Sequence, residues 1–247
     1  MGVLLVTGGS RGIGAAIAKT AAKKGYDVCV NYLSARERAD EVAAAVRAEG
    51  RRALVVQADV SREDDIVAMF RAVDRELGPI DALVNNAGVD YERLVADVER
   101  TGVERVFGIN VIGLILCCRE AVRRMSQDHG GRGGTIVNVS SVAARTGGLP
   151  KDAVYTASKG AVDAFTRGLS NEVAGQGVRV CAVRPGLTLT EIFESTLGQE
   201  GATELARRAV PMGRIGRPDE VAAMVLWLCS PEASYVTGFT YDVSGGR

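Results

Sequence analysis

The chain has 247 residues, 47% of them hydrophobic, and its 30 basic residues balance its 30 acidic residues. No Pro/Ser-rich linker or block of like charge divides it, so we expect residues 1–247 to form a single domain with a substantial core. The zero net charge argues against general binding to nucleic acid or to an anionic membrane, and we expect neither as a partner.

Cysteine usage and the apolar runs predict a cytoplasmic protein. The chain has five cysteines and no Cys-x-x-Cys pair, which fits reduced thiols buried in the core. An apolar strand is expected from Val3, which leaves no room for a signal peptide, and no apolar run reaches the length of a membrane span. His129 is the only histidine, so neither a histidine triad nor a multi-histidine metal site is expected, and we predict no metal.

Short apolar runs alternate with helical patterns along the whole chain. The expected strands are 3–6, 28–30, 53–56, 81–84, 134–139, 178–183 and 239–242. The expected helices are 15–24, 35–49, 61–77, 103–125, a helix from about Tyr155 to 174, and 218–229. Ser34 and Ser61 are candidate helix caps. This alternation predicts an α/β fold of the Rossmann type, a doubly wound parallel sheet of about seven strands with helices on both faces.

Ligands bind such sheets beyond the carboxyl ends of the strands. Six distinctive side chains of this chain are expected at such ends, namely Thr7, Tyr32, Asp59, Asn86, Ser141 and Pro185. Residues 187–211 follow the sixth strand and mix apolar with acidic side chains. We expect this segment to cover the substrate.

The turn after the first strand is rich in glycine. Gly8, Gly12 and Gly14 bracket Ser10, Arg11 and Ile13. Bare backbone lets a pyrophosphate approach, and the N-terminus of the following helix favours its charge, so this turn predicts a dinucleotide site. A Walker-type loop is excluded because no Gly-Lys-Ser/Thr follows.

The end of the second strand bears on the choice between NADP(H) and NAD(H). NAD-selective sites usually place an acid there, whereas this chain has Asn31, Tyr32 and Ser34. Arg11 and Ser34 are candidates to meet a 2′-phosphate, and Arg36 is a further candidate. We therefore expect NADP(H) to be preferred, with NAD(H) as the alternative.

Asp59 and Val60 follow the third strand, where an adenine ring would lie. The carboxylate would accept a hydrogen bond from the exocyclic amine of the ring, while Val60 packs on the base. Asp59 is equally suited to cap the turn that follows it.

Tyr155 and Lys159 lie four residues apart on a predicted helix, so their side chains share one face. A lysine ammonium beside a phenol favours the phenolate and lowers the pKa of the tyrosine. A general acid or base near neutral pH would need such a shift. A solvated helix face with a half-buried tyrosine gives the same spacing, so the pair alone does not establish the chemistry.

Taken together, these motifs resemble those of the short-chain dehydrogenase/reductase family, in its compact single-domain form. Within it, the chain is similar to 3-oxoacyl carrier protein reductases and glucose dehydrogenases. The resemblance covers nearly the whole chain, and it rests on the glycine turn from Thr7 to Gly14, Asn85-Asn86-Ala87-Gly88, the four residues Asn110, Ser141, Tyr155 and Lys159, and Pro185-Gly186 with Thr190.

The resemblance implies hydride transfer between nicotinamide and a small carbonyl or alcohol substrate. It assigns the general acid/base to Tyr155, the substrate oxygen to Ser141, the nicotinamide ribose to Lys159 and a water relay to Asn110. The remaining cofactor contacts that it implies are Asn86, Ala87, Gly88, Pro185, Gly186, Thr188 and Thr190. It also implies a homotetramer, with a homodimer as the alternative.

Four alternatives stay open at this point. Ser140 stands beside Ser141 and competes for its role. For Asn110, the alternative is that the residue bends its helix, or that its amide forms hydrogen bonds within the core, with no catalytic role. An enoyl reductase would reduce C=C in place of C=O, although such relatives typically place more residues between the tyrosine and the lysine. A non-catalytic dinucleotide sensor would keep the glycine turn and lose the four catalytic residues.

Overall fold

The computed structural model describes residues 2–189, 201 and 204–247. Its centre is one seven-stranded sheet in the order β3-β2-β1-β4-β5-β6-β7, in which every pair of neighbours is parallel. The strands are β1 Val3–Val6, β2 Asp27–Tyr32, β3 Ala53–Gln57, β4 Ala82–Asn85, β5 Gly134–Val139, β6 Val178–Pro185 and β7 Thr240–Val243. The predicted parallel α/β fold is confirmed.

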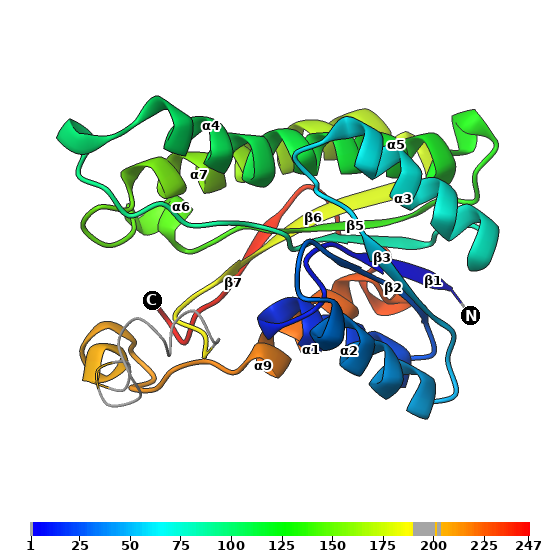
Figure 1. Cartoon of the computed structure of the whole chain (residues 1–247), viewed down its shortest axis with the longest axis horizontal. Helices are drawn as coiled ribbons and strands as arrows, with labels where there is room; N and C mark the ends of the chain where they lie inside the picture. The colour runs from blue at the N-terminus through cyan, green and yellow to red at the C-terminus, as the bar shows by residue number, and fades with distance from the viewer. Residues whose placement is uncertain (1, 190–200, 202–203) are drawn as a thin grey trace.

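Helices cover both faces of the sheet (Figure 1). One face carries α1 Gly12–Lys23, α2 Arg36–Ala48 and α9 Pro218–Leu228. The other carries α3 Glu63–Glu76, α4 Arg100–Phe107, α5 Leu114–Met125, α6 Ala143–Thr146 and α7 Ala153–Val173. Shorter elements are the 3₁₀ turns Val95–Asp97, Gln127–His129, Ala174–Gln176 and Pro231–Ala233, the π-helical turn Gly108–Gly113, and a helical stretch at 204–209.

Alternation along the central strands divides the core into two layers. On β1, Leu4 and Val6 pack with α1, α2 and α9, whereas Val3 and Leu5 pack with α3, α5 and α7. Successive side chains of a strand point to opposite faces, so a strand covered on both faces must be apolar throughout. All five cysteines are buried in these layers, as expected.

Two predicted helix caps do not form. α2 begins after Ala35 and α3 after Arg62, and neither helix has a side-chain hydrogen bond at its cap. Ser61 instead donates its hydroxyl to Asp59 at 2.7 Å. The start of α9 at Pro218 is confirmed, and the Glu220 carboxylate accepts from the backbone N–H of Arg217 at 2.7 Å.

Among the described residues, one helical run is long and apolar enough to cross a membrane by length and composition alone. It is Arg100–Met125, which joins α4, the π-helical turn and α5, and which the sequence reading had not expected to qualify. α5 buries Leu114, Cys117, Ala121 and Met125 against the sheet. Of the apolar window in this run, 33% is buried, and packing against the sheet accounts for that part.

The connection pattern places a crevice at one edge of the sheet. The chain leaves β1 towards β2 on one side, and β4 pairs with β1 on the other. In open parallel sheets, this topological switch point is where loops separate and ligands bind beyond the carboxyl ends of the strands.

Candidate active site

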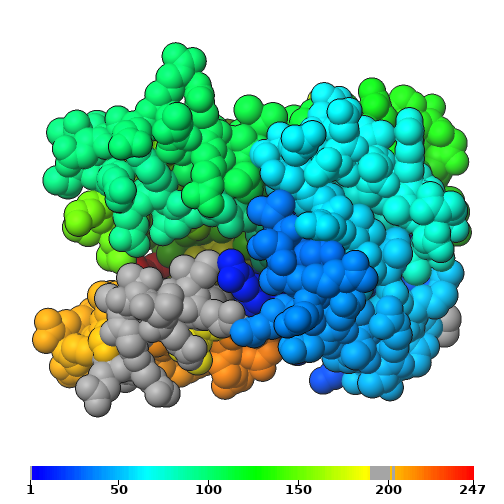
Figure 2. Space-filling model, viewed as in Figure 1, coloured from blue at the N-terminus to red at the C-terminus, as the bar shows by residue number. Residues whose placement is uncertain are grey.

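A cavity of about 770 Å³ lies at the carboxyl edge of the sheet. The segments that follow β1, β2, β3, β4, β5 and β6 all contribute to its wall, together with α7 and the C-terminal Arg247. In the space-filling view, a hollow lies between the green atoms on the α4 side and the dark-blue atoms of the N-terminal part of the chain (Figure 2). The predicted convergence of strand ends therefore produces a single cavity that spans the switch point.

The glycine-rich turn forms one end of this cavity. Gly8 has φ +61°, in the left-handed region, and a Cβ at Gly14 would lie 2.5 Å from Asn86 Nδ2. That amide donates to the carbonyls of Thr7 and Gly8, both at 3.0 Å. The wall of the cavity includes Gly8, Ser10, Arg11, Gly12 and Ile13, whereas Gly14 lies behind it. The turn therefore offers bare backbone at the N-terminus of α1, the arrangement that a pyrophosphate requires.

Asn31 and Tyr32 differ from the cofactor contacts expected of them. Asn31 Oδ1 accepts the Gly8 N–H at 3.1 Å, and Nδ2 donates to the Ala58 carbonyl at 3.0 Å. Asn31 borders the cavity, but its amide ties the ends of β1, β2 and β3 together. Tyr32 is 3% exposed, packs in the layer below α1 and α2, and does not line the cavity. Successive strand residues face opposite sides, so the two side chains diverge.

The end of β2 presents no carboxylate to the cavity among the described residues. Leu33, Ser34 and Ala35 line it there, opposite Arg11. Arg36 does not reach the cavity, because its guanidinium pairs with Asp40 on the next turn of α2 at 3.2 Å. Arg11 and Ser34 therefore border the cavity, and Arg36 does not.

Asp59 and Val60 both line the cavity beyond β3. Asp59 Oδ1 accepts from the Ser61 hydroxyl at 2.7 Å and from the Ser61 N–H at 2.9 Å. The carboxylate thus caps the turn, the second role that the sequence left open. Its position in the wall leaves the adenine contact available through the same side chain.

Lys159 is buried behind Tyr155 on the next turn of α7. Its ammonium donates to the carbonyl of Val139, the last residue of β5, at 2.9 Å and lies 5.7 Å from the centre of the Tyr155 ring. Burial lowers the pKa of Lys159 to about 8, against the opposing charges of Asp163 and Asp90. A lysine of this kind changes charge close to neutral pH.

Tyr155 has a raised pKa in the protein alone, in contrast to the lowered value expected from its spacing to Lys159. Burial is the main cause and brings the pKa to about 12; Asp90 and Asp152 add to it, and the Ser141 side chain opposes it. The ammonium of Lys159 is itself buried and hydrogen-bonded to the backbone, which explains why its charge does not lower the pKa of Tyr155 below the usual value. The phenol therefore keeps its proton.

The two serines after β5 have different surroundings. The Ser141 side chain lies near enough to the Tyr155 phenol to lower its pKa, and its Oγ accepts the Ala143 N–H at 3.1 Å. Ser140 is 3% exposed, and its hydroxyl donates to the carbonyl of Lys159 at 3.2 Å. Both serines border the cavity, and Ser141 is the one that acts on the pKa of Tyr155.

Asn110 is fully buried in the π-helical turn Gly108–Gly113. Its Oδ1 accepts the Val89 N–H at 2.8 Å, and its Nδ2 donates to the Val89 carbonyl at 2.9 Å and to Ser158 Oγ at 3.0 Å. Asn110 does not line the cavity. These hydrogen bonds anchor the loop after β4 to α7.

The nicotinamide side of the cavity follows β6. Pro185, Gly186 and Thr188 line the wall, and the Thr188 hydroxyl donates to the Gly186 carbonyl at 3.0 Å. Thr190 lies outside the described residues, as does most of the predicted covering segment 187–211.

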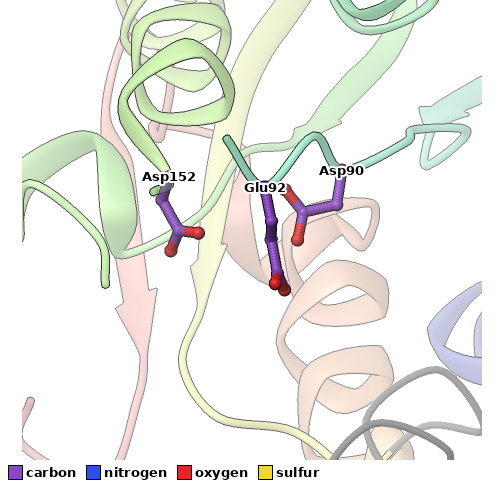
Figure 3. A group of neighbouring side chains, drawn as sticks. All are labelled: Asp90, Glu92 and Asp152. Atoms are coloured by element: carbon purple, nitrogen blue, oxygen red, sulfur yellow. The ribbon is translucent and has the colours of Figure 1, made fainter. Parts of the chain in front are cut away.

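Three carboxylates that the sequence reading missed line the same cavity. Asp90 and Glu92, in the loop after β4, and Asp152, at the start of α7, bring their oxygens within 4.8 Å of one another (Figure 3). Lys151 has φ +82°, and its carbonyl accepts the Arg93 N–H at 3.1 Å, which joins the two loops. No local sequence pattern predicts this cluster of carboxylates, because the two segments that form it lie far apart in the sequence.

Comparisons with known proteins agree with this geometry. A sequence model of the family described as enoyl-(acyl carrier protein) reductase matches residues 8–247. The chain is 48% identical over 248 residues to the uncharacterized oxidoreductase YgfF of Escherichia coli K12, with both chains fully covered. It is 35% identical over 242 residues to the 3-oxoacyl-[acyl-carrier-protein] reductase FabG of Staphylococcus aureus, covering 98% of this chain and 96% of that protein.

A solved structure is similar over nearly the whole chain. A short-chain dehydrogenase from Burkholderia cenocepacia in complex with NADP has a TM-score of 0.91 at 33% identity, covering 98% of this chain and 96% of that one. The chain belongs to the short-chain dehydrogenase/reductase family. Membership makes the protein an NAD(P)-dependent dehydrogenase or reductase, as the sequence motifs predicted.

Proposed function

We propose that this protein is an NADP(H)-dependent oxidoreductase that transfers hydride between nicotinamide and a carbonyl or secondary alcohol carbon, with Tyr155 as the general acid/base. One observation carries the proposal. Tyr155, with Ser141 beside it and Lys159 one helical turn away, lies in the wall of the cavity whose other end is the glycine turn. A dinucleotide laid along this cavity reaches from the turn to the tyrosine.

The proposed chemistry divides between cofactor and protein. The bound nicotinamide supplies or accepts the hydride, and the protein handles the proton on the substrate oxygen. In reduction, Tyr155 donates its phenolic proton to that oxygen, while the Ser141 hydroxyl stabilises the charge that develops there. In oxidation, the same proton returns to Tyr155.

Lys159 has two tasks in this proposal. Its ammonium bonds the ribose next to the nicotinamide and stabilises Tyr155 after the proton has left. The raised pKa of Tyr155, caused first by burial, favours a phenol that holds its proton.

The preference for NADP(H) is supported by the wall beyond β2. Arg11 and Ser34 border the cavity where a 2′-phosphate would lie, and the described residues after β2 present no carboxylate there. The structurally similar dehydrogenase from Burkholderia cenocepacia was solved with NADP. A kcat/KM for NADPH well above that for NADH is expected, and a strong preference for NADH would overturn this part of the proposal.

Enoyl reduction is the second candidate, because the family description that matches the chain names an enoyl reductase. Against it, Tyr155 and Lys159 lie on consecutive turns of α7, with Ser141 beside the phenol. A substrate panel with NADPH decides between them: 3-oxoacyl thioesters, sugars, quinones and simple ketones against 2-enoyl thioesters. Turnover of the carbonyl compounds supports the proposal, whereas turnover of the enoyl thioesters alone refutes it.

We also propose that residues 1–247 act as one domain, in the cytoplasm, as a homotetramer or homodimer. Exposed apolar side chains support self-association, among them Ile112 between α4 and α5, and Tyr235 and Phe239 before β7. Sedimentation of the purified protein tests the assembly, and a monomer at micromolar concentration would contradict it.

A further inference from the structure

Asp163 lies one turn beyond Lys159 on α7, on the same helix face. Side chains of a helix tilt towards its N-terminus, so the Asp163 carboxylate lies over the turn that carries Lys159. Its Oδ2 accepts from Arg184 Nε on β6 at 2.8 Å, and its buried Oδ1 has no hydrogen-bond partner among the residues that the structure describes. The side chains of Asp163 and Arg184 are only 14% and 20% exposed. A buried carboxylate oxygen is thus left to interact by charge alone.

Arg184 belongs to a longer chain of ion pairs. It also contacts Asp242, its register partner on β7, at 3.3 Å. Asp242 in turn pairs with Arg145 of α6 at 2.9 Å, and Arg145 donates to the carbonyl of Arg247 at 2.7 Å. This network runs from the back of α7 to the loop after Ser141 and to the C-terminus. Its pair between Arg184 and Asp163 fixes the Asp163 carboxylate on the side of α7 that faces β6.

Stability alone does not explain such a pair. Removing two charges from water costs several kcal/mol, so a buried ion pair is often no more stable than an apolar pair of the same size. Lys159, by contrast, gains directly from a carboxylate one turn away. The position of Asp163 therefore indicates that its carboxylate favours the positively charged form of Lys159.

We propose that Asp163 is a positioning residue for the reaction, which holds Lys159 in its ammonium form while Arg184 keeps the Asp163 carboxylate in place. The inference rests on the function proposed above, in which that ammonium bonds the ribose and supports Tyr155.

The charges around Lys159 agree with this assignment. From α7 itself, Asp163 and the phenol of Tyr155 face the ammonium, and from the loop after β4 it is Asp90. Burial lowers the pKa of Lys159, and Asp163 opposes that effect more than Asp90 does. Arg184 lies on the far side of Asp163, and Asp152 acts on Tyr155. Without Asp163, burial would lower the pKa of Lys159 further.

Two variants separate this role from a structural one. Asp163→Asn and Asp242→Asn each remove one carboxylate from Arg184. Of the two, Asp163 is the one that lies one helical turn from Lys159 and acts on its pKa. Lysines are few, at positions 19, 23, 24, 151 and 159, so ¹³C-lysine NMR can follow the titration of Lys159, with Lys159→Met for assignment. The pH profile of kcat/KM is measured on the same proteins.

We expect Asp163→Asn to move the titration of Lys159 down by about one pH unit, the lower end of the effect of a nearby opposite charge. The alkaline limb of the kcat/KM profile should move by the same amount. Asp242→Asn should leave both unchanged, and Asp163→Glu should restore them. If Asp163→Asn folds poorly, Asp163→Ser tests the same loss of charge in a smaller side chain.

An unchanged titration of Lys159 in a folded Asp163 variant would overturn the inference, as would equal shifts in the Asp163 and Asp242 variants. Neither result would contradict the proposed function. That function is contradicted by a different result, namely a Tyr155→Phe variant that retains its activity.

Discussion

The ammonium of Lys159 lies 5.7 Å from the centre of the Tyr155 ring, one helical turn away. Lys159 is buried, whereas Tyr155 is partly exposed in the cavity wall. Burial acts on the two side chains in opposite directions: it raises the pKa of the phenol and lowers the pKa of the amine. The pair is thus built to hold a proton on the oxygen and to lose one easily from the nitrogen.

The burial of Lys159 predicts a cost in stability. The folded protein lowers its pKa from 10.5 to about 8, so the unfolded chain binds more protons between these values and stability should rise with pH across that window. Lys159→Met should raise the free energy of unfolding at pH 7 by about 1–3 kcal/mol. Denaturant unfolding measures the change, with the exposed Lys23→Met as control. An equal effect of the two substitutions would contradict the account.

The position of Ser141 beside the Tyr155 phenol predicts unequal effects of the two serines. Ser141→Ala should lower kcat by about 10²-fold or more, because it removes a donor to the developing charge on the substrate oxygen. Ser140→Ala loses only its bond to the Lys159 carbonyl and should cost about 1 kcal/mol of stability with kcat nearly intact. Steady-state kinetics with NADPH and the best carbonyl substrate measures both. The reverse order would show that Ser140 holds the substrate.

Asn110 should act through the fold. Asn110→Ala leaves the N–H and C=O of Val89 without their partner, so we expect a loss of about 2–3 kcal/mol in the free energy of unfolding. Asn110→Asp keeps one of these bonds and should lose less. Urea titration measures the difference. A large loss of kcat in Asn110→Ala with unchanged stability would instead support the water relay.

Arg11 and Arg36 form a matched pair for the cofactor choice. Arg11 lines the cavity, while Arg36 pairs with Asp40 outside it. Arg11→Gln should reduce the ratio of kcat/KM for NADPH to that for NADH by about tenfold, the loss of one charge-assisted contact of roughly 1.4 kcal/mol. Arg36→Gln should leave the ratio unchanged. A fall in the ratio for Arg36→Gln alone would move the 2′-phosphate site onto α2.

The parallel sheet and the position of the cavity were predictable because they follow from local features of the sequence. Strand–helix alternation, the glycine turn and the spacing of Tyr155 and Lys159 each depend on residues within a few positions of one another. They were sufficient to predict the parallel sheet and the edge at which the cavity forms. The start of α9 at Pro218 was also predictable from the local sequence.

The features that the sequence reading missed depend on distant segments or on strand phase. Asn31 and Tyr32 both end β2, yet only one of two successive residues can face the cavity, and the phase is set by the packing of Tyr32 under α1 and α2. Asn110 finds its partner in Val89, a backbone group of another loop. The Asp90 loop meets Asp152 only through the fold. The raised pKa of Tyr155 follows from burial, which residue spacing does not report.

Tyr155→Phe tests the central claim most directly. The substitution removes one hydroxyl and keeps the ring beside Lys159, so NADPH affinity, measured by fluorescence titration, should be unchanged. The account predicts that the turnover of a carbonyl substrate falls by about 10²–10⁴-fold, the contribution of a positioned general acid. A variant that binds NADPH normally and still reduces the carbonyl at the rate of the unmodified protein would contradict the account.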